Sequence, residues 1–163
     1  MNLTSVIAPE NKIFSKTVAL EMVCDFTDPN LLPGNEVWFV GYPENRFDTV
    51  NNLPILRRGY IASLPKIDFE GRKQFLIDAQ VFPGSSGSPV FTALNGKMQL
   101  LGIVSETMIK HGQLQMLPTA QAIGVQQIIG LGIVLKATLL RPLAEKALEE
   151  LRLRRQQLGQ DVP

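Results

Sequence analysis

The sequence has 163 residues, of which 45% are apolar, and its 16 basic and 15 acidic residues leave a formal net charge of +1. This length suits one ordinary domain or two small ones, and the near-neutral charge provides no field that would attract nucleic acid or anionic lipid. The single cysteine, Cys24, excludes an internal disulfide, and with only one histidine the chain lacks the ligands of a Cys/His zinc site. We therefore expect no nucleic-acid partner, no metal and no cofactor.

Residues 1–34 carry weak structural signals. The N-terminus has no charged start followed by a long apolar run, and no window reaches the roughly 18 apolar residues of a membrane span. We expect no export signal in this sequence and no membrane partner. The sequence assigns no compartment, with a periplasmic or secreted location as the alternative if an N-terminal signal was lost. An apolar patch from Val18 to Val23 predicts a partial strand, and the turn-rich segment from Asp25 to Gly34 predicts a connector.

Six short β-prone runs follow, separated by Gly, Pro, Asn or Asp residues. Their hairpin-like spacing predicts a small antiparallel barrel or sandwich of the all-β class. Asn95 and Gly96 lie between two of the runs and favour the positive backbone angles of a tight hairpin turn. The predicted strands cover residues 36–40, 55–62, 74–79, 88–93, 98–105 and 131–137.

The C-terminal segment changes from strand-like to helical periodicity. Apolar residues recur there at three- and four-residue spacing, which predicts an amphipathic helix over residues 138–158 with Pro142 in its first turn. We expect this helix to pack on the barrel, with a partner helix or a membrane surface as alternatives because its end is basic. The apolar positions are Leu140, Leu143, Ala144, Ala147, Leu148 and Leu151.

The most informative motif lies in residues 81–91. The strand-turn-helix elbow of other hydrolases reads G-x-S-x-G, but Ser88 stands at its last position here and a strand-like run follows. The order G-x-S-G-x-P before an apolar strand instead suits a glycine-rich loop whose backbone N–H groups converge beside a serine hydroxyl. Gly84 would allow the unusual backbone angles of such a loop, and its N–H and that of Ser86 would form an oxyanion hole.

With this motif the sequence resembles the trypsin-like serine peptidases of the chymotrypsin fold, in the bacterial-type variant that reads Gly-x-Ser-Gly-Ser-Pro. Residues 41–43, 58–62 and 101–105 are also similar to that family. The resemblance implies that Ser86 is the nucleophile and that Gly84 contributes to the oxyanion hole. It further implies a six-stranded antiparallel barrel of the chymotrypsin type with a C-terminal α-helix.

The family has two barrels, and the resemblance covers only the second. It divides the chain into a remnant strand and inter-barrel connector (1–34), the C-terminal barrel (35–137), and a C-terminal helix and tail (138–163). The N-terminal barrel, which supplies the base and the acid of the triad in this family, would be missing. We therefore expect the polypeptide partner to be a substrate or a peptide ligand, with self-association or the missing barrel as a further partner.

The resemblance also implies a substrate pocket. Gln80 would lie at its base, and Ser105, Glu106 and Thr107 would line its wall. Because Gln80 is uncharged, a basic substrate side chain would have no obvious counter-ion there. Ser85 replaces the acidic residue that the family's zymogen switch requires, so activation by that route is not expected.

The missing base decides the expected activity. The only histidine, His111, follows Ser86 in the chain, whereas the family's base precedes the nucleophile, and we expect His111 to be an exposed loop residue. Our hypothesis is a serine-type endopeptidase that is truncated, with Met1 lying just after a lost triad acid, and inactive alone. The alternatives are a non-catalytic, peptidase-like binding module and an unrelated six-stranded barrel.

Overall fold

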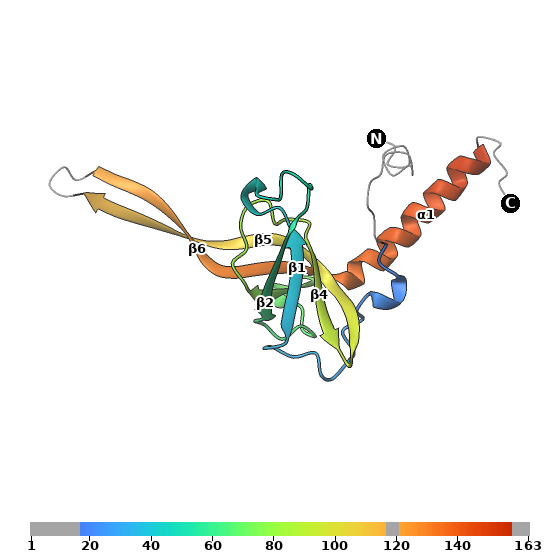
Figure 1. The fold of residues 1–163 in the computed structure, drawn as a ribbon. Helices are drawn as coiled ribbons and strands as arrows, with labels where there is room; N and C mark the ends of the chain where they lie inside the picture. The colour runs from blue at the N-terminus through green and yellow to red at the C-terminus, as the bar shows by residue number, and fades with distance from the viewer. Residues whose placement is uncertain (1–16, 117–120, 158–163) are drawn as a thin grey trace.

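The computed structural model describes residues 17–116 and 121–157 as a closed antiparallel barrel followed by one α-helix (Figure 1). The strands are connected in the barrel in the order β1-β2-β3-β6-β5-β4. This architecture confirms the predicted six-stranded barrel of the chymotrypsin type with a C-terminal helix. The elements are β1 (Glu36–Gly41), β2 (Ile55–Ile61), β3 (Gln74–Asp78), β4 (Pro89–Leu94), β5 (Lys97–Met116), β6 (Gln121–Lys136) and α1 (Leu140–Gln157).

The strand registers follow from the alternation of buried and half-buried side chains and from one tight hairpin turn. On β1, Val37 and Phe39 are fully buried while their neighbours are only half-buried, so one face of the strand points into the barrel. Asn95 and Gly96 connect β4 to β5 with φ angles of 51° and 73°, which are the positive angles of a type I′ hairpin turn. The predicted hairpin is therefore confirmed.

The core fills the inside of the barrel and extends under the N-terminal connector. Phe26 from the connector packs edge to face on Phe75 of β3, with ring centroids 5.9 Å apart. The connector thereby closes one part of the barrel. The buried cluster consists of Cys24, Phe26, Leu31, Val37, Phe39, Ile61, Phe75, Ile77, Ala79, Val81, Val90, Leu94, Leu101, Val104 and Val134.

Strands β5 and β6 are longer than the sequence pattern predicted. Their pairing continues beyond the barrel to Met116↔Gln121, and Figure 1 shows the two strands leaving the barrel as a long ribbon. The prediction ended the fifth strand at Ser105 because the polar run around His111 is typical of a loop. A two-stranded ribbon needs no buried face along that run, since its backbone groups are paired across the ribbon.

The N-terminal prediction was wrong in one respect. The patch around Val18 to Val23 forms a short 3-10 helix, η3 (Leu20–Met22), and only Val23 makes a strand-like bridge, to Leu100. The predicted remnant around Met1 lies outside the described residues. Further 3-10 turns are η4 (Pro43–Asn45), η5 (Phe69–Gly71) and η6 (Ala137–Leu139).

Helix α1 was predicted correctly as a helix, but its expected packing on the barrel is wrong. It projects away from the barrel on the side opposite to the β5–β6 ribbon (Figure 1), and apart from half-buried Leu140 every side chain described in it is exposed. Within the described part of the chain, neither α1 nor any shorter helix has the length and apolar character to cross a membrane.

Candidate active site

The segment between β3 and β4 folds into a compact loop that presents Ser86. The N–H of Ser85 donates to the Phe82 carbonyl at 3.0 Å, and the N–H of Ser88 donates to the Ser85 carbonyl at 3.1 Å, so two successive turns shape the loop. Ser85 and Ser88 are buried, whereas Ser86 is exposed at the tip. This arrangement leaves one serine hydroxyl open to solvent on a firmly held backbone.

Two neighbouring segments anchor this loop. The N–H of Gly87 donates to the Val104 carbonyl at 2.8 Å, and the N–H of Val104 donates to the Ser88 carbonyl at 2.9 Å, which ties the loop to β5. On the other side, the N–H of Glu44 donates to the Pro83 carbonyl at 2.7 Å. The loop is therefore clamped between β5 and the turn that follows β1.

Gly84 can only be a glycine in this loop, for two reasons. Its φ angle is +87°, a conformation that side chains bearing a Cβ rarely adopt. A Cβ at this position would also lie 2.5 Å from the Tyr42 carbonyl oxygen and 3.3 Å from the Glu44 amide nitrogen. The close approach of the two backbones thus explains the glycine that the motif analysis singled out.

The hydroxyl of Ser86 is held by β5. Its Oγ donates to the carbonyl oxygen of Ser105 at 2.6 Å. Among the described residues, neither the Gly84 N–H nor the Ser86 N–H donates a hydrogen bond. Two unpaired backbone donors therefore lie on either side of Ser85, next to an exposed hydroxyl, and such donors are the components of an oxyanion hole.

The predicted wall residues lie where β5 departs from regular pairing. The β5–β6 register shifts between Val104 and Glu106 and again between Thr107 and Ile109, and bulges of this kind redirect strands beside functional sites. Ser105 falls at the first shift, where its carbonyl accepts the bond from Ser86.

The other predicted pocket residues differ in how closely they approach the loop. Thr107 Oγ1 donates to the Val81 carbonyl at 2.9 Å, which joins β5 to the start of the loop. Glu106 is exposed on the same strand. Gln80 is exposed after β3, and no hydrogen bond connects its side chain to a described residue. Thus Ser105 and Thr107 make hydrogen bonds to the loop, whereas no such bond from the side chain of Gln80 or Glu106 occurs among the described residues.

Arg57 is a residue that the sequence analysis missed. It lies opposite Phe39 in the β1–β2 register, and its guanidinium carbon lies 4.8 Å from the centroid of the Phe82 ring and 5.7 Å from that of Phe39. Burial lowers the pKa of this guanidinium from its ordinary value, yet arginine keeps its charge in proteins. Because Phe82 begins the first turn of the loop, Arg57 supports the loop from inside the barrel.

The signal for Arg57 is present in the sequence, although it needs the strand register to be read. Strand alternation puts Arg57 on the same face as the buried Ile61 and Gly59, so one of two adjacent arginines had to point inward. Its neighbour Arg58 points outward and pairs with Glu36 at 3.6 Å.

The backbone of His111 lies far from Ser86. His111 belongs to the part of β5 that continues beyond the barrel and pairs there with Gln126, so its predicted loop setting is wrong. It lies six residues beyond Ser105, and an extended strand rises about 3.3 Å per residue, so the two backbones are separated by about 20 Å. The ribbon therefore carries the only histidine of the sequence away from the loop.

Two acidic residues before Ser86, Asp25 and Asp28, are engaged in turns. The carboxylate of Asp25 accepts from the N–H and the hydroxyl of Thr27 at 2.9 and 2.8 Å, and these bonds lower its pKa. The carboxylate of Asp28 accepts from the N–H of Asn30 at 2.8 Å. Both therefore cap local turns, which agrees with the turn-rich connector predicted from Asp25 to Gly34. No cluster of metal-ligating side chains occurs in residues 17–116 and 121–157.

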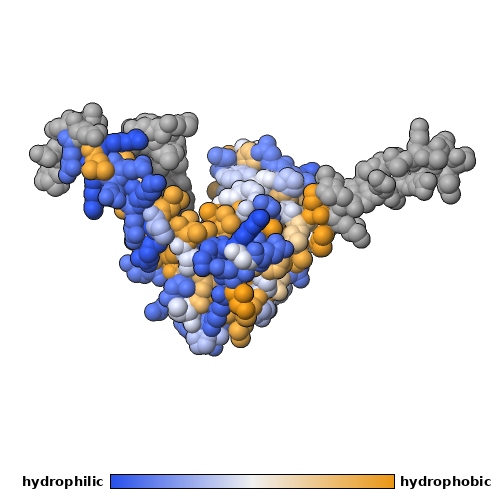
Figure 2. All heavy atoms as spheres, turned by 180° about the vertical axis from the view of Figure 1, so that it is seen from behind, coloured by the Kyte–Doolittle hydropathy of each residue, from blue (hydrophilic) through white to orange (hydrophobic). Residues whose placement is uncertain are grey.

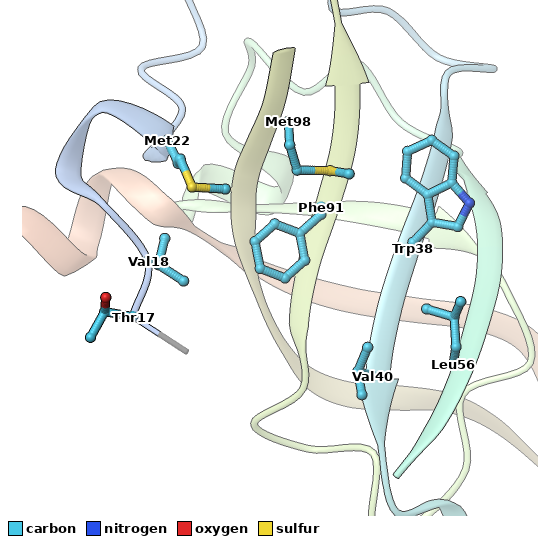
Figure 3. A pocket seen from close by; sticks show the side chains of 8 residues that line it. All are labelled: Thr17, Val18, Met22, Trp38, Val40, Leu56, Phe91 and Met98. Atoms are coloured by element: carbon cyan, nitrogen blue, oxygen red, sulfur yellow. The ribbon is translucent and has the colours of Figure 1, made fainter. Parts of the chain in front are cut away.

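A second feature is an apolar groove on the outside of the barrel, with a volume of about 470 Å³. Figure 3 shows Trp38, Val40 and Leu56 from β1 and β2 on one side of it and Phe91 and Met98 from β4 and β5 in the middle. The segment around η3 closes the other side. The lining residues are Thr17, Val18, Met22, Trp38, Val40, Leu56, Phe91 and Met98.

The closed six-stranded barrel and the serine loop together define the class of protein. Residues 17–103, more than half of the chain, match the trypsin-like peptidase domain, and the chain therefore belongs to that family. The matched region includes Ser86 and the whole of its loop. The family implies polypeptide substrates. No match to the chain was found among curated proteins.

Proposed function

We propose that the chain is the nucleophile-bearing barrel of a serine-type endopeptidase. One observation carries the proposal: the exposed hydroxyl of Ser86 lies beside the N–H groups of Gly84 and Ser86, which have no acceptor among the described residues. In this mechanism Ser86 Oγ attacks the peptide carbonyl carbon, and the two N–H groups stabilise the oxyanion. The amine then leaves, and water hydrolyses the acyl-enzyme.

The reaction needs a base that takes the proton from Ser86 Oγ and returns it to the leaving amine. The position of His111 on the distal ribbon does not suit it for this role. We therefore propose that the base and the acid are supplied by a second barrel, and that the chain alone is inactive as a peptidase. A serine without its base keeps only the small rate enhancement that substrate binding and an oxyanion hole provide.

The apolar groove is the face on which we propose that this second barrel docks. Leu56 of β2 and Met98 of β5 are 66% and 48% exposed in it, which is an unusual exposure for two large apolar side chains that line one groove. The groove and the serine loop both contact the end of β1, because Val40 lines the groove and the next residue, Gly41, packs against Ser88 at the base of the loop. We propose that the second barrel extends from the groove past this end of β1 towards Ser86.

A serine-reactive fluorophosphonate probe tests this proposal on the purified chain. We expect slow labelling at a single site, no labelling of Ser86→Ala, and unchanged labelling of Ser88→Ala, because Ser88 is buried in the same loop. We expect no measurable peptide hydrolysis by the chain alone. Labelling that survives Ser86→Ala would contradict the nucleophile assignment. Complete absence of labelling would favour the peptidase-like binding module instead.

A further inference from the structure

Helix α1 presents an apolar face that the barrel leaves uncovered. Only its start approaches the barrel, where Thr138, Arg141 and Pro142 line a cavity of about 250 Å³ together with Val23, Cys24 and Asp25. Further along, Leu143, Leu148 and Leu151 are 65%, 55% and 53% exposed. Figure 2 shows apolar atoms at the surface of this projecting helix among hydrophilic ones. Most of the stability of helices in proteins comes from the packing of an amphipathic face, so a partner for this face would stabilise α1.

The sequence of apolar residues on this face of α1 is the same in both chain directions. Its residues are separated by three, one, three, one and three positions, and their identities are also symmetric: two leucines, two alanines and two leucines. These spacings put all six on one side of the helix. We call this set the symmetric stripe; it consists of Leu140, Leu143, Ala144, Ala147, Leu148 and Leu151.

A stripe with this symmetry is complementary to itself when a second copy runs antiparallel. Leu140 then lies opposite Leu151 of the second copy, and Ala144 lies opposite Ala147 of the second copy. The small alanines at the centre allow close approach of the two helices, and the leucines at both ends enclose them. A two-fold axis relates the two copies, as is usual for homodimers, in which one patch contacts its own copy.

The charges of the helix favour the same orientation. Arg154 follows Leu151 by three positions and lies on the same side of the helix. In the antiparallel arrangement Arg154 is level with Ala137 of the second copy, beside the cavity that exposed Asp25 lines together with Arg141 and Thr138, so Asp25 is the acidic group nearest to its level. A parallel arrangement would instead bring Arg154 against its own copy, where like charges repel.

We propose that two copies of this chain associate through antiparallel pairing of α1 along the symmetric stripe. The barrels then lie at opposite ends of the helix pair, and neither the serine loop nor the apolar groove takes part in the contact. The proposal is independent of peptidase activity, since it rests only on the helix and on the cavity at its base.

Sedimentation of the purified full chain over a dilution series tests the association. We expect a mass of twice 18.0 kDa that falls towards 18.0 kDa on dilution. The double variant Ala144→Glu/Ala147→Glu should remain at 18.0 kDa, with unchanged helix content by circular dichroism because glutamate is a good helix former. Glu149→Gln, half a turn of the helix away from the stripe, should behave like the unmodified chain. A mass of 18.0 kDa at every concentration, or a dimer that the double variant retains, would overturn the proposal.

The orientation is tested by single cysteines at the centre of the stripe. In the antiparallel pair, position 144 faces position 147 of the second copy, so a mixture of Ala144→Cys and Ala147→Cys chains should form a disulfide-linked dimer on oxidation. Each variant alone should crosslink at least tenfold less. The native Cys24 is buried, and the unmodified chain serves as the control for it. Efficient crosslinking of each variant with itself would show parallel pairing and overturn the antiparallel arrangement.

Discussion

Replacing Gly84 by alanine tests whether the proposed oxyanion hole depends on the backbone conformation of the serine loop. Gly84 and Gly87 have the same φ angle of +87°, so an alanine at either position meets the same backbone strain. Such strain costs about 1–2 kcal/mol for a residue with a Cβ. The two sites differ in their surroundings, because the new Cβ would lie 2.5 Å from the Tyr42 carbonyl oxygen at position 84 but meets nothing within 4 Å at position 87.

This difference predicts distinct outcomes for the two variants. Gly87→Ala should lower the free energy of unfolding by about 1–2 kcal/mol and leave fluorophosphonate labelling nearly unchanged. Gly84→Ala should lose more free energy than Gly87→Ala, because the clash with the Tyr42 backbone adds to the same strain, and the clash should displace the loop from Tyr42, which moves one N–H of the proposed oxyanion hole. Removal of one such donor slows acyl transfer by about 10²- to 10³-fold, and we expect a loss at the lower end of this range.

Urea denaturation gives the free energy of unfolding of both variants, and the rate of probe labelling reports on the oxyanion hole. Both measurements are made on folded protein, verified by circular dichroism. Equal slowing of labelling in the two variants would refute the reasoning, because only Gly84 contacts the neighbouring backbone. Normal labelling of Gly84→Ala would show that its N–H does not serve the reaction.

Two further substitutions test the groups that support the barrel and its loop. Arg57→Met removes the cation over the Phe82 ring, so it should slow probe labelling several-fold and lower the free energy of unfolding by about 1 kcal/mol. The control is Arg58→Met, which should leave labelling unchanged because Arg58 lies on the exposed face of β2. Asp68→Asn removes the hydrogen-bonded partner of buried Lys136, at 2.7 Å, and should destabilise the fold at neutral pH.

Asp68→Asn should also change how the free energy of unfolding depends on pH. Hydrogen bonds from Lys136 and Lys73 lower the pKa of Asp68 in the folded state. The stabilisation is therefore fully present above the unfolded pKa of an aspartate, about 3.9, and is lost as the pH falls through the lower folded value. Urea denaturation across this range should show a weaker pH dependence for Asp68→Asn. An identical pH dependence of the unmodified chain and of Asp68→Asn would contradict the stabilising role of Asp68. Slowed labelling of Arg58→Met would contradict the specific support of the serine loop by Arg57.

Much of the barrel could be predicted because its signals are local. Strands β1, β2 and β4 are short runs with period-two alternation, and a turn such as Asn95-Gly96 sets its own geometry. The ends of β5 and β6 could not be read in this way, since the polar run around His111 resembles a loop until a partner strand pairs with it. The prediction of a strand near Val18 was wrong for a related reason. The apolar residues of this segment line the groove, and the segment does not pair as a strand of the sheet.

In the candidate site, too, the residues of a local motif could be predicted, whereas a residue that depends on strand register could not. Ser86 and Gly84 could be selected from the sequence because a short motif of glycine and serine has a specific backbone requirement. The support by Arg57 could not be selected, since a guanidinium between two rings depends on the register of β1 with β2 and on the return of the chain at Phe82.

By itself, the sequence determined the fold class, the positions of the six strands along the chain apart from the ends of β5 and β6, the amphipathic helix and the position of the serine motif. Local backbone preferences and hydrophobic periodicity are sufficient for these properties. Only the tertiary structure decided that the Ser86 hydroxyl meets the Ser105 carbonyl, that the ribbon carries His111 away from the loop, and that α1 projects with its apolar stripe uncovered. These properties depend on how strands distant in the sequence close into a barrel, and no single segment encodes that closure.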